Sequence, residues 1–347
     1  MDLATLAREA VPAATLERLR SARHVLAVGH ENPDADTLGA SMALAILVEQ
    51  LGGRATVVMS DAVPALYAFL PGVDRVLADP PPGEPFDLLL LSDCAAPDRV
   101  GGVAQRNPAP FADLPRLVVD HHVSNDDAGA ADWIDPQAAA TCEMVALLAV
   151  RLGIPLDAAG GALATLLMAG IVMDTATFAH PNATPRTLAV AAALVDAGAP
   201  LSDISRRLYR TKPDAQLRLF GRVLDRLRTS AEGHVLWSTL LQADFDATGA
   251  LPAHSEGIID LLAQSESAEV ALLFKEQPDA TTRLSVRTKP GGVDATALTG
   301  AFGGGGHARA AGATIDAPLD AAIVQATELA GRLAAVVERT RSAELRR

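Results

Sequence analysis

The chain is poor in aromatic residues and in cysteine. Phenylalanine, tryptophan and tyrosine together make up only 3% of its 347 residues, so stacking of bases on an aromatic platform is not expected to be its main means of binding. Cys94 and Cys142 are too few, and too unpatterned, for a disulfide framework or a cysteine zinc site. Both are therefore expected to be reduced thiols.

Positive charge is also scarce. The chain has 29 lysines and arginines against 42 aspartates and glutamates, and its formal net charge is −13. Proteins that coat long nucleic acids usually present a basic surface, so no long duplex is expected as a partner. A small phosphorylated substrate held by metal ions remains compatible with this charge.

No apolar run is long enough to cross a membrane. The longest, Ala162 to Met173, falls well short of the ~20 residues that a transmembrane helix needs. Residues 1–20 predict a short amphipathic helix of mixed charge rather than a secretory signal. We therefore expect a cytoplasmic protein with no membrane partner.

The length of the chain suits two domains that each bury a core. Apolar strands and helices alternate as far as Ala199. Residues 201–230 then carry eight basic and three acidic residues at helical spacing, which suits a solvated helix face or a patch that attracts phosphate. Strand-like runs return from Gly233. We expect an α/β domain with a parallel, Rossmann-like sheet at 1–199, a helical linker at 200–230 and a smaller α/β domain at 231–341.

Acids and histidines follow three apolar, strand-like runs of the first domain. A fourth position, Asp174, follows an apolar helical run. The resulting cluster comprises His30, Asp34, Asp36, Asp93, His121 and Asp174. In an open, doubly wound sheet the ligand site lies beyond the carboxyl ends of the strands, so these side chains are expected to meet there.

Four carboxylates in one place would repel each other, at roughly 4 kcal/mol per pair for a 4 Å separation and an effective dielectric of about 20. Two divalent cations would offset their charge. Mixed carboxylate and imidazole ligands suit Mn²⁺, Fe²⁺ or Co²⁺ better than Ca²⁺, with Mg²⁺ as a further candidate. Two such ions and an activated water indicate hydrolysis of a phosphoric ester or anhydride. A single strand-end aspartate, by contrast, would ordinarily be a cap or turn residue.

A run of glycines marks the second domain. Gly303 to Gly306 are consecutive and precede His307. Such a run forms either a flexible turn or a loop whose backbone N–H groups approach an anion. The sequence alone leaves both alternatives open.

These residues resemble the DHH phosphoesterase superfamily. The similarity lies in His30-Glu-Asn-Pro-Asp34-Ala-Asp36, Asp93, Asp120-His121-His122 and Asp174. Arg287, together with Gly303 to Gly312, is similar to the DHHA1 substrate domain. The pairing of both domains resembles the NrnA-type branch, whose members are manganese-dependent oligoribonucleases and pAp phosphatases, and some of which cleave cyclic-di-AMP or pApA. The resemblance implies two Mn²⁺ ions and a homodimer.

The resemblance also implies a role for each motif residue. His30, Asp34 and Asp93 would hold one ion, and the other would be held by Asp36, Asp93, His121 and Asp174. His122 would contact the scissile phosphate, and Asp120 would orient the site without binding a metal ion itself. The nucleotide would be held by Arg287, Gly304, Gly305, Gly306 and His307.

Two positions depart from the family pattern. Ala35 replaces a glycine of the first motif, a small change that should leave the ligands intact. Ala179 stands where an arginine often follows the fourth motif, which leaves the preference among pAp, pApA and longer RNA open.

The expected function is metal-dependent hydrolysis of short nucleotides, namely oligoribonucleotides and pApA to mononucleotides, and pAp to AMP and phosphate. A cyclic-di-AMP phosphodiesterase is the closest alternative. A manganese inorganic pyrophosphatase shares the first-domain motifs but would not need the glycine-rich segment. A nucleotide-sensing protein without catalysis is the alternative from another class.

Overall fold

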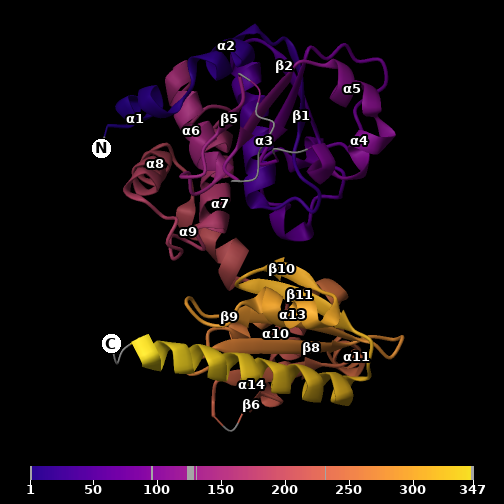
Figure 1. Cartoon of the computed structure of the whole chain (residues 1–347). Helices are drawn as coiled ribbons and strands as arrows, with labels where there is room; N and C mark the ends of the chain where they lie inside the picture. Colours follow the sequence, from indigo (N-terminus) through magenta and orange to yellow (C-terminus); the bar gives the residue numbers. More distant parts are fainter. Residues whose placement is uncertain (1, 95–96, 123–128, 130, 231, 345–347) are drawn as a thin grey trace. The chain divides into compact units, whose positions relative to one another are not determined.

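The computed structural model describes residues 2–94, 97–122, 129, 131–230 and 232–344. The chain forms two compact units, Met1–Thr211 and Lys212–Arg347, which we call unit 1 and unit 2. Each unit is built around one sheet (Figure 1). The expected α/β class is confirmed, since five parallel strands form the first sheet and a second α/β unit follows.

The sheet of unit 1 has the strand order β2-β1-β3-β4-β5. Its strands are β1 (His24–Val28), β2 (Arg54–Val58), β3 (Leu88–Ser92), β4 (Arg116–Asp120) and β5 (Trp133–Ile134). Every residue of β1 and β3 is buried, because helices cover both faces of the sheet. This burial explains why the strands appear in the sequence as continuous apolar runs.

Side chains of one strand alternate between the two cores of unit 1. In β1, Val25 and Ala27 belong to the larger core, whereas Leu26 and Val28 belong to the smaller one. The larger core is made with α1 (Leu3–Ala10), α2 (Ala13–Ser21), α3 (Ala35–Gln50), α6 (Thr141–Leu152), α7 (Ala162–Asp174) and α8 (Pro185–Asp196). The smaller core is made with η3 (Pro97–Val100), α4 (Gly102–Arg106) and α5 (Pro108–Asp113). Unit 1 is therefore a three-layer α/β structure.

Short helical segments complete unit 1. These are η1 (Ala65–Tyr67), η2 (Val73–Arg75), α9 (Leu201–Ser205) and the π-helical η4 (Arg206–Arg210).

The sheet of unit 2 has the order β10-β11-β9-β8-β7-β6. Its strands are β6 (Arg228–Thr229), β7 (Val235–Leu240), β8 (Val270–Glu276), β9 (Thr282–Thr288), β10 (Gly305–His307) and β11 (Ala310–Ile315). Among the described strand pairs of this sheet, β7 and β8 alone are parallel, and the others are antiparallel. α13 (Ala295–Thr299) and α14 (Leu319–Glu344) pack on one face. The opposite face of β7 and β8 packs against α10 (Asp214–Asp225), α11 (Gln242–Thr248) and α12 (Ile258–Leu262). The segments η5 (Pro252–Ser255) and η6 (Gly300–Phe302) complete this unit.

Two local expectations were wrong. The single N-terminal helix is in fact α1 and α2, because Val11 is extended before Pro12 and a residue that precedes proline avoids the helical region. The glycine-rich segment is only partly a loop, since Gly305–His307 form β10 and pair with β11. A Cβ atom at Gly304 would overlap the carbonyl oxygen of Gly312, so this glycine allows a close approach of backbones.

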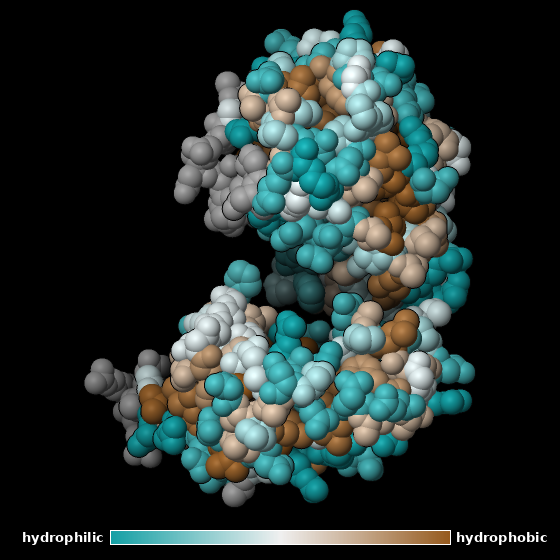
Figure 2. Space-filling view, turned by 90° about the vertical axis from the view of Figure 1, so that its right-hand side faces the viewer, coloured by the Kyte–Doolittle hydropathy of each residue, from teal (hydrophilic) through white to brown (hydrophobic). Residues whose placement is uncertain are grey.

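Residues 200–230, for which the sequence predicts a helical linker, contain α9, η4, α10 and β6. The division between the units falls inside this segment, after Thr211. The face shown in Figure 2 is mostly hydrophilic, with hydrophobic patches on both units. Among the described residues no single helix is long and apolar enough to cross a membrane, although the bent pair Pro185–Asp196 and Leu201–Arg210 meets the criteria of length and composition.

Candidate metal centre

The strand order of unit 1 determines where a ligand site would form. In the strand order β2-β1-β3-β4-β5, the chain adds β2 on one side of β1 and the later strands on the other side. The boundary between β1 and β3 is therefore the topological switch point, and in such sheets ligands bind there, outside the carboxyl ends of the strands. The loop from Gly29 to Asp34 follows β1, and Asp93 directly follows β3. His121 and His122 follow β4, next to β3.

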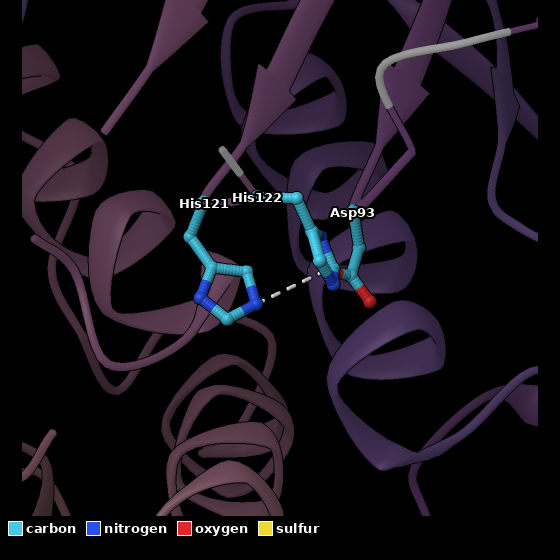
Figure 3. A group of neighbouring side chains, drawn as sticks. All are labelled: Asp93, His121 and His122. Atoms are coloured by element: carbon cyan, nitrogen blue, oxygen red, sulfur yellow. Dashed lines mark ion pairs between the residues drawn. The ribbon is translucent and has the colours of Figure 1, made fainter. Parts of the chain in front are cut away.

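The structure brings all six expected ligands together at this edge. Ligand atoms of His30, Asp34 and Asp93 lie within 4.8 Å of one another, and so do those of Asp36, His121 and Asp174. Asp93 forms a third group with His121 and His122, and Figure 3 shows these three side chains turned towards each other. Asp93 therefore belongs to two of the three groups, and His121 connects it to the third.

Distances within the cluster are short. His30 Nε2 lies 3.4 Å from Asp93 Oδ2, and His121 Nε2 lies 3.6 Å from Asp93 Oδ1. His121 Nε2 also lies 3.2 Å from Asp174 Oδ2. Asp93 is almost fully buried, at 2% exposure, and adopts a left-handed backbone conformation with φ 58°. Such strain in a non-glycine residue is typical of functional sites.

The first motif is held by helix α3. Asp34 is the N-cap residue of α3, and its Oδ1 accepts hydrogen bonds from the backbone N–H groups of Asp36 and Thr37, each at 2.9 Å. Capping uses one carboxylate oxygen, so Oδ2 remains available as a ligand. His30 Nδ1 lies 2.6 Å from the carbonyl oxygen of Glu31, a contact that leaves Nε2 for the cluster.

Asp36 is held by the N-terminus of helix α6. The backbone N–H groups of Thr141 and Cys142 donate to its two carboxylate oxygens, at 2.7 and 2.9 Å. The N-cap residue of α6, Ala140, offers no side-chain cap, so the carboxylate of Asp36 takes this place and gains from the helix dipole. The orientation of this carboxylate is therefore fixed before any metal binds.

Two threonine hydroxyls brace Asp93. Thr37 Oγ1 donates to Asp93 Oδ2 at 2.7 Å, and Thr141 Oγ1 donates to Asp93 Oδ1 at 3.1 Å. Thr141 thus contacts one member of each ligand group, Asp93 through its hydroxyl and Asp36 through its backbone. We did not identify Thr37 or Thr141 from the sequence, because threonines at helix starts ordinarily serve as caps.

The electrostatics of the cluster fit divalent cations. Burial, reinforced by the charges of Asp174 and Asp93, raises the pKa of Asp36 well above its usual value, and burial also raises the pKa of Asp174. Burial opposes the protonation of His121, but its hydrogen bond to Asp174 and the charges of Asp36 and Asp93 raise its pKa to about 10. In the absence of metal, these pKa shifts favour bound protons on the cluster. Its imidazole and carboxylate groups are donors that suit transition-metal ions.

We predict that binding of a divalent metal releases at least one proton at pH 7. His121, with its pKa raised from 6.5 to about 10, is protonated at this pH, and a metal ligand must be neutral imidazole. Metal affinity should therefore rise as the pH increases from 6 towards 9. Calorimetric titration of Mn²⁺ into metal-free protein in PIPES and in Tris, whose ionisation enthalpies differ, measures the proton count. Equal apparent enthalpies in the two buffers would contradict the prediction.

Asp120 lies directly behind His122. Its Oδ1 accepts a hydrogen bond from the backbone N–H of His122 at 3.1 Å and lies 2.8 Å from His122 Nδ1. Asp120 is fully buried, and its Oδ2 has no hydrogen-bond partner within the described part of the chain. The side chain of His122 is 38% exposed, and its Nδ1 lies 3.6 Å from Asp93 Oδ1. Asp120 thus fixes the ring of a partly exposed histidine beside the ligand cluster.

Gly170 in helix α7 is a further residue on which the cluster depends. A Cβ atom at this position would overlap Asp36 Oδ1 and Cys142 Sγ. The absence of a side chain therefore allows α7 to approach Asp36, and α7 carries Asp174 at its end. From sequence, one glycine within an apolar helix gives no sign of this role.

We predict that Gly170→Ala weakens Mn²⁺ binding about 10-fold or more, a typical effect of disturbing the groups that orient metal ligands. Isothermal titration calorimetry measures this affinity. Gly221→Ala in α10 is the matched control, because no heavy atom lies within 4 Å of a Cβ atom there, and the change should leave Mn²⁺ binding unaltered. Equal Mn²⁺ affinity in the two variants would show that Gly170 has no such role.

The segment after Asp174 turns sharply. Ala176, Thr177 and Phe178 all have positive φ, at 48°, 59° and 62°, and the turn returns to Asp174. The carbonyl oxygen of Asp174 accepts a hydrogen bond from Asn182 Nδ2 at 3.2 Å and lies 3.3 Å from His180 Nδ1. Ala179 offers no charged group here.

The expected substrate residues of unit 2 share one row of the sheet. His307 lies opposite Ala310 in the antiparallel register, and Ala310 lies opposite Arg287. Residues directly opposite each other point to the same face, so Arg287 and His307 share a face. Arg287 is 31% exposed and donates from Nε to Asp260 Oδ1 at 2.8 Å. Gly305, Gly306 and His307 are exposed, and Gly304 is half-buried.

Comparison with known proteins identifies relatives of both units. Residues 24–171 match the DHH family, N-terminal domain, and residues 236–335 match the DHHA1 domain. A Thermus thermophilus protein named bifunctional oligoribonuclease and PAP phosphatase NrnA is 32% identical over 290 residues, which cover 82% of each chain. A Bacillus subtilis protein of the same name is 28% identical, over 82% of this chain and 87% of the relative.

A solved structure supports the fold. The crystal structure of an exopolyphosphatase-related protein from Bacteroides fragilis superimposes with a TM-score of 0.83 at 19% identity, over 94% of this chain and 98% of that one. The region that matches the DHH family contains every motif residue of the metal cluster except Asp174, which lies three residues beyond its end. The region that matches the DHHA1 domain contains both Arg287 and His307. The chain belongs to the DHH family, in the branch in which a DHHA1 domain follows the DHH domain.

Proposed function

We propose that the chain is a divalent-metal-dependent phosphoesterase that hydrolyses short nucleotides. Its substrates would be short oligoribonucleotides and pApA, cleaved to mononucleotides, and pAp, cleaved to AMP and phosphate. The observation that carries this proposal is the pair of ligand groups around Asp93. The names of the Thermus and Bacillus relatives support the class of substrate.

The residues of the cluster divide into two ligand sets in this proposal. His30, Asp34 and Asp93 would hold one cation, and the second would be held by Asp36, Asp93, His121 and Asp174. Divalent cations at such a pair of sites supply Lewis acidity for a phosphoryl oxygen and a lowered pKa for water. We propose Mn²⁺ as the native metal, with Mg²⁺ or Co²⁺ as alternatives, because the donor set mixes imidazole and carboxylate.

His122 would act on the scissile phosphate. Its ring is held by buried Asp120 on one side and is 38% exposed, so it is both oriented and accessible. The contact with Asp120 Oδ1 turns Nδ1 of the ring towards the carboxylate, so Nε2 would be the atom that contacts a phosphoryl oxygen or the leaving group.

Unit 2 would hold the rest of the nucleotide. Arg287 would bind a phosphate through its planar guanidinium, exchanging its exposed ion pair with Asp260 for the ligand. The strand Gly305–His307 shares this face, and Gly305, where no heavy atom lies within 4 Å of an added Cβ atom, leaves room for a base or ribose beside the backbone. We further propose that the chain is a homodimer.

A panel of substrates tests the proposal. The panel comprises pAp, pApA, cyclic-di-AMP, RNA of two to seven nucleotides and pyrophosphate, each with Mn²⁺ and ranked by kcat/KM. We expect pApA, the shortest RNAs and pAp to rank above cyclic-di-AMP and pyrophosphate. A first rank for cyclic-di-AMP would favour the cyclic-dinucleotide phosphodiesterase, and a first rank for pyrophosphate the pyrophosphatase. Mn²⁺ binding without turnover of any compound would favour a nucleotide-sensing protein.

A further inference from the structure

One part of a sheet face in unit 2, along β9, is exposed or half-buried in the described part of the chain. Along β9, Leu284 and Val286 are buried in the core with α13 and α14, whereas Arg283, Ser285 and Arg287 alternate with them and point to the opposite face. On that opposite face, α10 and α12 pack against β7 and β8. Arg283, Ser285 and Arg287, which lie beside the core formed with α10 and α12, therefore remain at least partly accessible to solvent.

Two cations meet on this accessible face. Lys275 of β8 lies directly opposite Arg283 of β9 in the antiparallel register. Like charges directly opposite one another destabilise a sheet, and within the described part of the chain neither side chain forms an ion pair with a carboxylate. The contacts of the Lys275 ammonium are instead Ser255 Oγ at 3.5 Å and the ring of Phe245, whose centroid lies 5.3 Å away.

The surroundings of Lys275 leave its charge poorly compensated. Burial lowers the pKa of the Lys275 ammonium, and the positive charge of Arg283 lowers it further. The negative charge of an anion bound between the two side chains would offset both effects. The pair thus has the electrostatics of a site that is completed by a ligand.

A cavity of about 360 Å³ opens beside Lys275. Phe245, Ala250 and Pro252 give it an apolar lining. Gln242 and Asp246 supply an amide and a carboxylate, which can hydrogen-bond to the edge of a base. Apolar walls with a few polar groups are typical of small-molecule sites, and the adjacent cations specify a ligand that also carries negative charge.

We propose that Lys275 and Arg283 form a second phosphate subsite, and that the adjacent cavity receives the base of the same nucleotide unit. The proposal rests on the proposed function and extends it. Arg283 and Arg287 are four residues apart on β9, or about 13 Å at ~3.3 Å per residue. This distance is too long for both arginines to bind the same phosphate, so the subsite engages a different nucleotide of the substrate from the one held at Arg287. It determines how strongly oligonucleotides longer than pApA bind.

The test compares Lys275→Met/Arg283→Gln with the wild-type chain over RNA of two to seven nucleotides. We expect kcat/KM for pApA and pAp to stay within about twofold, and kcat/KM for the longer RNAs to fall about 10-fold, mainly through KM. The control is Arg332→Gln/Arg339→Gln, which removes the same charge from exposed positions of α14 on the other face of the sheet. An equal loss for every length, or no loss for the longer RNAs, would overturn the proposal.

Calorimetric titration separates this proposal from the proposed function. Should the wild-type chain hydrolyse none of the RNAs, the proposed function fails, but the double variant must still bind a hexaribonucleotide about 10-fold more weakly than the wild type. Unchanged binding would refute the subsite. Titration with AMP distinguishes a phosphate that belongs to an oligonucleotide from one that belongs to a free mononucleotide. Loss of AMP binding in the double variant, without any effect of RNA length, would overturn the proposal in favour of a separate mononucleotide ligand.

Discussion

Asp36→Asn is expected to lower kcat/KM for pApA by at least roughly 10³-fold, which corresponds to about 4 kcal/mol of transition-state stabilisation. Both carboxylate oxygens of Asp36 accept backbone N–H groups from the start of α6, and an amide has only one oxygen to offer. Its NH₂ group would face one of the two N–H donors in either orientation of the amide, so one of these hydrogen bonds is lost. The substitution also removes one of the negative charges that would hold the cations.

The Asp36→Asn variant should keep its fold, because the change adds no volume to the core. Circular dichroism and thermal unfolding of the metal-free protein check this, and Asp196→Asn, at an exposed position of α8, is the matched control with unchanged activity. Mn²⁺ titration should show the loss of one binding equivalent. Turnover of pApA within tenfold of the wild-type rate would refute the assignment of Asp36.

Asp120→Asn should lower kcat by about 10²–10³-fold, while Mn²⁺ affinity changes little. Asp120 contributes to none of the three ligand groups, but its Oδ1 contacts both the backbone N–H and the Nδ1 of His122. An asparagine amide would orient the His122 ring less firmly than the carboxylate does, and loss of the carboxylate partner of a catalytic histidine is costly in other hydrolases. Single-turnover kinetics measure the effect on the chemical step.

Calorimetry with Mn²⁺ distinguishes this role of Asp120 from a structural one. A variant that fails to bind metal would show that Asp120 supports the ligands rather than His122. An unchanged kcat in Asp120→Asn would contradict the assigned role.

The sheet of unit 1 and its ligand edge were predictable because the signals are local. β1, β3 and β4 are buried on both faces, so each appears as an apolar run, and each run ends at a residue of the cluster. The parallel arrangement then places those ends at one edge. Asp174 could be included because it ends an apolar helix, although nothing local shows that α7 reaches this edge.

Features that depend on contacts between distant segments were not predictable. The capping of α6 by Asp36 joins positions 105 and 106 residues apart in sequence. Gly170 matters only because Asp36 and Cys142 pack against it. Likewise, the glycines at 304 and 306 were assigned to a loop, because only the pairing of β10 with β11 reveals how closely the two backbones approach.

The central claim is that the ligand cluster of unit 1 is a two-metal centre that hydrolyses nucleotide phosphoesters. Chelated, metal-free protein should be titrated with Mn²⁺ while the release of AMP from pApA is followed. We expect no turnover without metal, and a rate that reaches its plateau at two equivalents of Mn²⁺ per chain. Turnover that persists after chelation, or a plateau at one equivalent, would contradict the account.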